Sequence, residues 1–217
     1  MSNENLFNTF IKSFNTNFLK TITTLSKSKE KYPRSVVKSN IKLLSGDDLK
    51  KNAIKWNNKN NTNNTNNTNK INDFSSVDGI FPFYDNDGTL KLLFIEFKHI
   101  LVDNESFQEK REKFKKDLKL KPLETLNCVL PHLIDRFCNN PEFNKKEKEL
   151  ISYLFNCPKA YICVINYTTK NKLFSNNIRE DQDVFDIKKL SKHPFDCVKI
   201  MNPNEFIKYM ELKDKNT

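Results

Sequence analysis

The stretch SSVDGIFPFYDNDGTLKLLFIEFKHI, residues 75–100, decides the fold. Two apolar runs flank the sequence Asp-Asn-Asp-Gly at 85–88, and Asp-Gly between apolar runs is typical of a β-hairpin. We therefore predict strands at 75–84 and 89–100. The second run is the most hydrophobic strand of the chain, yet Glu96 and Lys98 interrupt it.

The positions of Glu96 and Lys98 in the strand indicate which face they share. Side chains two residues apart in a strand share a face, so Glu96 and Lys98 point the same way as Leu92 and Phe94. Burying such charges without partners is costly, so they need counter-charges or a metal ion. Counting from the turn, position 78 pairs near position 95. We therefore expect Asp78 to lie within a residue or two of Glu96, with Lys98 beside both.

Two carboxylates beside an ammonium group suit hydrolytic chemistry on phosphate esters. Mg²⁺ (or Mn²⁺) prefers oxygen ligands and keeps several waters. A water molecule held near Lys98 would attack a phosphodiester, and the developing charge would be stabilised by the cation and the ammonium. Asp78 and Glu96 are the predicted metal ligands, and Lys98 completes the predicted catalytic set.

This pattern resembles the active-site signature of the PD-(D/E)XK nuclease superfamily, with Asp78 in SSVDGIF and Glu96 and Lys98 in LLFIEFKH. The resemblance implies that the acidic pair binds Mg²⁺ and that the lysine orients or activates the water. It also implies a restriction endonuclease-like fold. Many members add an acid from the first helix, and the resemblance favours Glu30 for that role.

Context distinguishes this match from others in the chain. The spacing [DE]-x-K also begins at four further acids, which are Asp48, Asp117, Asp186 and Glu211. Only the match at Glu96 ends an apolar strand that follows a turn and an upstream Asp. Two other interpretations stay open: Glu96 and Lys98 could form an ion pair on a solvated edge strand, and Asp78 could be a turn residue.

The remaining elements predict an α/β fold with a central mixed β-sheet of about four strands flanked by helices. Apolar spacing predicts helices at 6–25, 47–56, 105–118, 122–137 and 145–155, with Pro131 kinking or breaking the fourth. Further strands are expected at 160–167 and 197–200. Asn202, Pro203 and Glu205 predict the start of a last helix.

We divide the chain into three parts. Residues 1–56 form an N-terminal helical segment that packs on the core, because they offer too few elements for a core of their own. Residues 57–70 are an Asn-rich flexible loop with nothing to bury. Residues 71–217 form the nuclease-like α/β core.

Charge favours a polyanionic partner. The 217 residues contain 37 Lys and Arg against 27 Asp and Glu, a net charge of +10. Such a balance favours nucleic acid first and an anionic membrane surface second, whereas the other interpretation is a solvated, Lys-rich surface. The helix at 105–118 could contact phosphates through Lys110, Arg111, Lys113 and Lys115, although acidic residues between them favour a solvated face.

The five cysteines and three histidines have no zinc-ligand spacing, so we expect reduced core thiols. No signal sequence and no membrane-spanning run is recognisable, which favours a cytoplasmic protein without membrane contact.

The first hypothesis is a Mg²⁺-dependent DNA endonuclease. The alternatives are a catalytically inactive nucleic-acid-binding module of the same fold, or a protein-interaction domain of a mobile-element or defence system. The sequence leaves open whether the substrate is DNA or RNA, whether it is branched or recognised by its sequence, and whether the chain is a homodimer.

Overall fold

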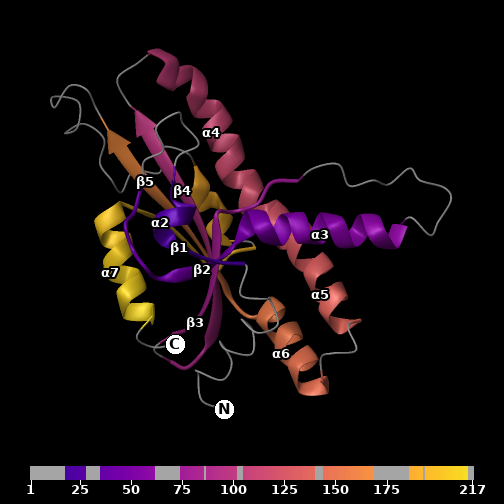
Figure 1. Ribbon diagram of the computed structural model, residues 1–217. Helices are drawn as coiled ribbons and strands as arrows, with labels where there is room; N and C mark the ends of the chain where they lie inside the picture. Colours follow the sequence, from indigo (N-terminus) through magenta and orange to yellow (C-terminus); the bar gives the residue numbers. More distant parts are fainter. Residues whose placement is uncertain are drawn as a thin grey trace.

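The computed structural model describes residues 18–27, 35–61, 74–85, 87–101, 105–139, 144–168, 186–192 and 194–214. Its centre is a mixed six-stranded sheet with the strands in sequence order (Figure 1). The strands are β1 (Leu19–Thr21), β2 (Lys42–Ser45), β3 (Gly79–Tyr84), β4 (Leu90–Leu101), β5 (Lys159–Thr168) and β6 (Cys197–Met201). The first four pair antiparallel, and β4, β5 and β6 pair parallel. The general class predicted from the sequence is confirmed.

The sheet is wider than expected because the N-terminal segment supplies two strands. Leu19–Thr21 belongs to the segment for which we predicted a helix, and only the short α2 (Ile22–Leu25) is helical in its described part. Strand β2 pairs β1 with β3. Both strands are three or four residues long, too short to produce a recognisable alternation of apolar and polar residues.

The predicted hairpin of β3 and β4 forms, but its first strand begins at Gly79 rather than at residue 75. Gly79 pairs with Ile95 and Tyr84 with Leu90. The turn between them uses Gly88 at φ 76°, a conformation that glycine adopts without steric cost.

Helices cover both faces of the sheet. They are α3 (Gly46–Asn61), α4 (Glu105–Glu124), α5 (Leu130–Cys138), α6 (Lys145–Asn156) and α7 (Pro203–Asp214). Apolar residues of α3, α4 and α5 pack on one face around Phe94 and Tyr161. On the other face, α7 and α2 pack around Ile95 and Phe97 (Figure 1). The alternation predicted for β4 is therefore confirmed, and each face of the strand has its own core.

Helix boundaries differ from the prediction at several places, and α4, predicted to end at residue 118, continues to Glu124. Helix α3 continues to Asn61, into the segment for which we expected a loop. Of the two effects predicted for Pro131, a kink or a break, the break is wrong, because α5 runs through it. A π-helical turn, Thr125–Val129, precedes it, and the Leu130 N–H donates to the Thr125 carbonyl five residues earlier. Pro131 has no N–H to donate, but it lies in the first turn of α5, where a proline is tolerated.

The last helix starts as predicted. Asn202 Oδ1 accepts hydrogen bonds from the backbone N–H groups of Asn204 and Glu205, each at 2.9 Å. The Glu205 carboxylate accepts from the Asn202 N–H at 3.1 Å. This reciprocal cap fixes where α7 begins.

Candidate active site

The hairpin brings Asp78 and Glu96 together. Since Gly79 pairs with Ile95, Asp78 lies one position before the strand, opposite Glu96. The Phe97 backbone N–H donates to Asp78 Oδ2 at 2.7 Å, which holds the carboxylate against β4. The Asp78 carbonyl accepts from the Gly46 N–H at 3.2 Å. Asp78 is therefore fixed to β4 and to the start of α3, rather than being only a turn residue.

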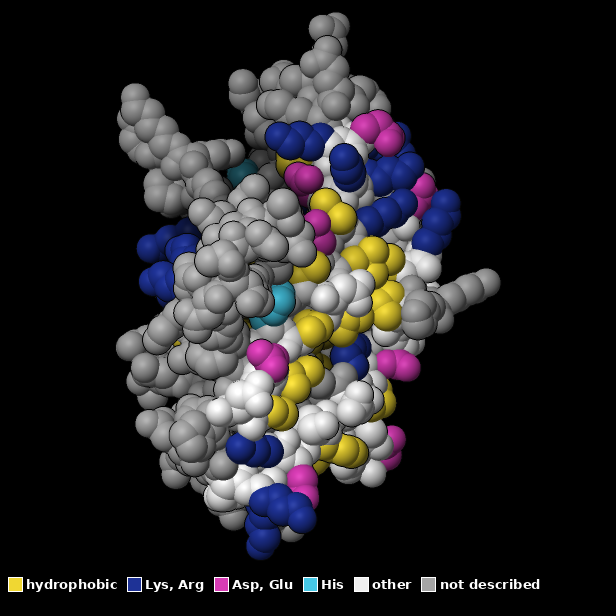
Figure 2. All heavy atoms as spheres, turned by 90° about the vertical axis from the view of Figure 1, so that its right-hand side faces the viewer, with side chains coloured by type: hydrophobic (Ala, Val, Ile, Leu, Met, Phe, Trp, Pro, Cys, Tyr) yellow, Lys and Arg dark blue, Asp and Glu magenta, His cyan; other side chains and the backbone are white. Residues whose placement is uncertain are grey.

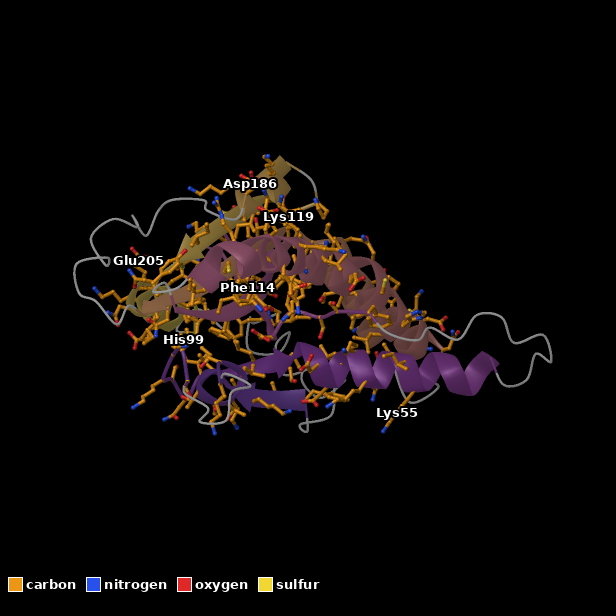
Figure 3. The ribbon with its side chains drawn as sticks, turned by 90° about the horizontal axis from the view of Figure 1, so that it is seen from above. Lys55, His99, Phe114, Lys119, Asp186 and Glu205 are labelled. Atoms are coloured by element: carbon orange, nitrogen blue, oxygen red, sulfur yellow. The ribbon has the colours of Figure 1, made fainter. Side chains whose placement is uncertain are left out.

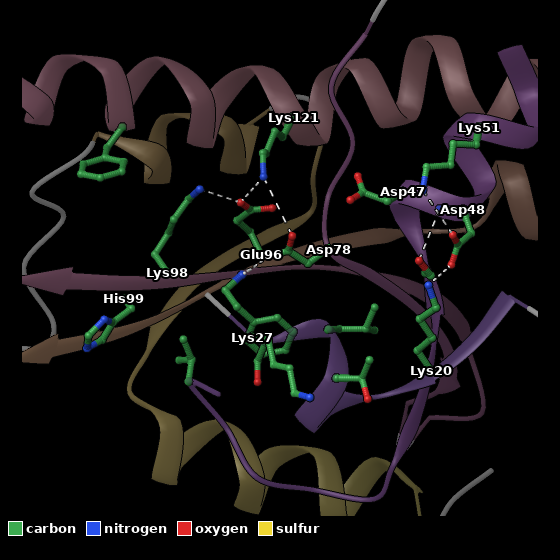
Figure 4. Close-up of a pocket in the computed structure, with 17 residues that line it drawn as sticks. Lys20, Lys27, Asp47, Asp48, Lys51, Asp78, Glu96, Lys98, His99 and Lys121 are labelled. Carbon is green, nitrogen blue, oxygen red and sulfur yellow. Dashed lines mark hydrogen bonds and ion pairs between the residues drawn. The ribbon is translucent and has the colours of Figure 1, made fainter. Parts of the chain in front are cut away.

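Glu96 is the most deeply buried acid of the site, with 0% of its surface exposed. Its Oε1 atom lies 3.0 Å from Lys98 Nζ and 2.5 Å from Lys121 Nζ, as Figure 4 shows. Strand β4 lies between β3 and β5, so it is a central strand. This arrangement overturns the alternative of an ion pair on a solvated edge strand.

The second carboxylate oxygen of Glu96 has no protein partner. Glu96 Oε2 is buried, and it accepts no hydrogen bond within the described part of the chain. A buried acceptor without a partner costs free energy. Such an oxygen next to a second carboxylate is a group to which a hard divalent cation can bind.

Burial and the neighbouring Glu96 charge perturb the pKa of Asp78. Burial first, and the Glu96 charge second, raise the pKa of Asp78 to about 7, although Lys121, Lys98 and the Phe97 N–H counteract them. Burial alone would lower the pKa of Lys121. The charges of Glu96 and Asp78 and the hydrogen bond to Glu96 outweigh that effect, so the Lys121 pKa is raised. Perturbed acids in a cavity are typical of functional sites.

A cavity of about 560 Å³ contains these groups. Phe114 and Lys121 of α4 line one part of its wall, and residues of β1, α2 and the N-terminus of α3 line another. His99 also lines the cavity, and Figure 4 shows its side chain on the opposite side of β4 from Glu96, as its strand position predicts. The charged residues lining the space are Lys20, Lys27, Asp47, Asp48, Lys51, Asp78, Glu96, Lys98 and Lys121.

The N-terminus of α3 adds two acids to the cavity. Asp47 Oδ1 accepts a hydrogen bond from Ser76 Oγ at 2.9 Å, and its charge contributes to the raised pKa of Lys121. Asp48 forms an ion pair with Lys20 of β1. Asp47 is thus the third carboxylate near Lys121, whereas the Asp48 charge is balanced by Lys20.

The acidic pair suits Mg²⁺ or Mn²⁺. Within the described residues, no three Asp, Glu, His or Cys side chains form a complete ligand group. Mg²⁺ is usually held by one or two carboxylates and several waters, so Asp78 and Glu96 fit its requirements without a third residue.

The other predicted site residues lie elsewhere. Glu30, and the side chain of Lys110, are outside the described residues. Arg111, Lys113 and Lys115 are not among the residues lining the cavity, and Lys115 forms an ion pair with Asp186 at 2.7 Å. Figure 3 shows Asp186 and Lys119 together on one side of α4.

Lys121 is the principal residue that the sequence analysis missed. It lies on the buried face of α4, in the helical series Phe114, Leu118, Lys121 and Thr125, of which Leu118 and Thr125 are 0% exposed. A lysine that interrupts an apolar helical stripe was the available signal. Asp47 carries no such signal, because acids are common in the first turn of any helix.

Burial also determines the protonation state of the two buried thiols. Cys157 and Cys163 are buried, and none of the five cysteines forms a disulfide. Burial raises the pKa of Cys157 to about 11 and that of Cys163 further. Both thiols therefore stay protonated, as expected for residues of the core.

No protein-family model, no curated protein and no solved structure matches this chain. No described helix combines the length and the apolar composition needed to cross a membrane. The site's own geometry is therefore the basis for a functional assignment.

Proposed function

We propose that this protein is a Mg²⁺- or Mn²⁺-dependent DNA endonuclease that hydrolyses phosphodiester bonds. The observation that carries the proposal is the meeting of Asp78, Glu96 and Lys98 in one cavity, with Glu96 fully buried and one of its oxygens without a protein partner. A buried oxygen without a partner destabilises a hydrophobic core, whereas in a cation site it can serve as a ligand.

Each residue has a defined role in this proposal. Asp78 Oδ1 and Glu96 Oε2 are the oxygens that would hold the cation, which supplies Lewis-acid activation of the phosphodiester when bound. Lys98 Nζ forms an ion pair with Glu96 Oε1 at 3.0 Å, and the Lys98 side chain is 18% exposed. Its ammonium can thus hold a water at the cavity wall and stabilise negative charge that develops on the phosphate. Asp47 adds a third carboxylate near the pair, in place of Glu30.

We further propose that the core is of the restriction endonuclease type. Support comes from the order of its elements, in which the hairpin carrying the acids is followed by helices and then by β5, parallel to β4. Strands β1 and β6 would then be additions at the two edges of that four-stranded unit.

The proposed substrate is DNA because of the net charge of +10 and the lysines around the cavity. Figure 2 shows basic side chains gathered, with acidic ones between them, on the upper part of the face where α4 lies in Figure 1. Lys27 and Lys51 are exposed and line the cavity, so they are the first candidates for contacts to the flanking phosphates.

The test is cleavage of plasmid, branched and single-stranded DNA in the presence of Mg²⁺ or Mn²⁺. We expect Asp78→Ala and Lys98→Ala each to lower the rate by at least about 100-fold, because a positioned catalytic group contributes that much. The matched controls are Asp117→Ala and Lys119→Ala, which have the same spacing on α4 and lie outside the cavity residues. Undiminished cleavage by both site variants would refute the proposal.

A catalytically inactive nucleic-acid-binding module is the second candidate. It is favoured by the ion pairs of Glu96, since Lys98 and Lys121 already balance the two carboxylates. This module would bind DNA with a strong dependence on salt and would show no cleavage with either metal ion.

A further inference from the structure

Lys121 enters the site from a different element than the other charged groups. Its Nζ atom lies 2.5 Å from Glu96 Oε1 and 4.0 Å from Asp78 Oδ1, so one ammonium contacts both predicted metal ligands. Figure 4 shows the Lys121 side chain reaching from α4 toward these two carboxylates. Lys98 contacts Glu96 from β4 by itself, so Lys121 is not needed to position Lys98.

The backbone of Lys121 is held firmly at this place. The buried Thr125 hydroxyl donates to the Lys121 carbonyl at 2.8 Å and accepts from the Val77 N–H at 2.9 Å. The Glu124 carboxylate accepts from the Ser75 N–H. These bonds join the end of α4 to the segment that leads into Asp78, so α4 cannot withdraw Lys121 without disturbing the acid itself.

Because the backbone is fixed, only the Lys121 side chain can move when a divalent cation approaches the two carboxylates. Two carboxylates, Asp78 and Glu96, face two ammonium groups, Lys98 and Lys121, so this group of four is neutral when both acids are ionised. A divalent cation between the same carboxylates would lie within a few ångströms of the Lys121 ammonium, where like charges repel strongly. The Lys121 side chain is 21% exposed to the cavity and has four rotatable side-chain bonds, so it can turn away.

We propose that Lys121 is a built-in counter-ion that lies against both predicted metal ligands in the metal-free protein and competes with a cation for them. When a divalent cation enters, the ammonium turns into the cavity, where it meets the phosphate of the bound nucleic acid. Lys121 thereby makes metal binding weak in the absence of nucleic acid and couples the two ligands. This inference rests on the proposed metal site and adds a regulation that the acidic pair and Lys98 do not themselves provide.

The test measures Mn²⁺ binding by titration calorimetry without nucleic acid. We expect Lys121→Met to bind Mn²⁺ about tenfold more tightly or better than wild type, because an internal competitor and a nearby like charge are removed. Lys121→Gln should behave in the same way, and circular dichroism would verify that both variants fold. The control Lys119→Met, on the same helix, should leave the affinity unchanged.

A second readout uses the wild-type protein alone. We expect the NMR signal of the Lys121 ammonium to shift on addition of Mg²⁺, whereas that of Lys119 does not. Unchanged Mn²⁺ affinity in the Lys121 variants, or an unmoved Lys121 signal in a protein that binds Mg²⁺, would overturn the counter-ion proposal alone. Absence of Mn²⁺ binding in wild type and all variants would overturn the metal site and this inference together.

Discussion

Replacing Asp78 with asparagine should make the metal-free protein more stable at pH 8. The ionised carboxylate is held beside Glu96 in a cavity that disfavours charge, which raises its pKa to about 7. Asparagine has nearly the same shape, and its amide oxygen can still accept the Phe97 N–H hydrogen bond. The substitution therefore removes the repulsion and the desolvation cost but keeps the hairpin contact.

The magnitude follows from the pKa. A carboxyl whose pKa rises from 3.8 to about 7 is disfavoured in its charged form by about 4 kcal/mol above pH 7. The Asp78 side chain is 23% exposed, and solvent screening reduces the figure to about 1–2 kcal/mol. In a chain of this size, that difference corresponds to a rise in melting temperature of about 3–6 °C.

The destabilisation by the Asp78 carboxylate depends on pH. Below about pH 4 the carboxyl is protonated in both the folded and the unfolded state, so it imposes no penalty. Between about pH 4 and 7 the unfolded chain loses its proton first, so the wild type loses stability as the pH rises. The advantage of Asp78→Asn should therefore be large at pH 8 and less than half as large at pH 5.

The assay is thermal unfolding followed by circular dichroism, in a chelating buffer, at pH 5 and pH 8. Glu112→Gln is the matched control, because Glu112 is an exposed carboxylate of α4 and should show no comparable gain. A melting temperature of Asp78→Asn equal to or below that of wild type at pH 8 would refute the electrostatic reasoning. A gain of equal size at both pH values would do the same.

Three other measurements check further parts of the structure. Gly46→Ala should destabilise the protein by more than about 3 kcal/mol, because a Cβ there would lie 1.8 Å from a backbone carbonyl oxygen; a denaturation midpoint like that of wild type would contradict this packing. Lys213→Met should cost about 1–2 kcal/mol, because Lys213 Nζ contacts Asp85 Oδ1 at 2.8 Å and lies over two aromatic rings. The exposed Lys208→Met on the same helix is the control for thermal unfolding, and equal losses in both variants would refute the role of the contact. Finally, Mn²⁺ affinity should rise between pH 6 and pH 8, since Asp78 must lose a proton whose pKa is about 7; calorimetry showing a flat profile over this range would count against Asp78 as a ligand.

The hairpin could be predicted because its signals are local. The Asp-Gly turn fixes the register within a few residues, and the register fixes which acid lies opposite Glu96. The two faces of β4 could be assigned from the alternation of side chains alone. Asp78, Glu96 and Lys98 therefore appear together in both the sequence analysis and the structure.

Contacts between distant elements could not be predicted in this way. Lys121 meets Glu96 only because α4 crosses that face of the sheet: the apolar stripe marks the buried face of the helix, but not which strand that face covers. Asp47 reaches the cavity because Gly46 lets α3 start directly against the backbone of Val77 and Asp78, just before β3. Strand β1 is an edge strand whose residues also fit a helical stripe, so only its pairing with β2 distinguishes the two.

The parallel pairing of β4 with β5 has a consequence for how the protein is made. Glu96 lies opposite Cys163, and a parallel partner can dock only after its long crossover connection is complete. Since a ribosome releases the N-terminal part first, the nascent chain carries its charged strand with an open edge until β5 emerges. The burial that raises the pKa of Asp78 is therefore acquired late in synthesis, and that open edge is where two growing chains could pair wrongly with each other.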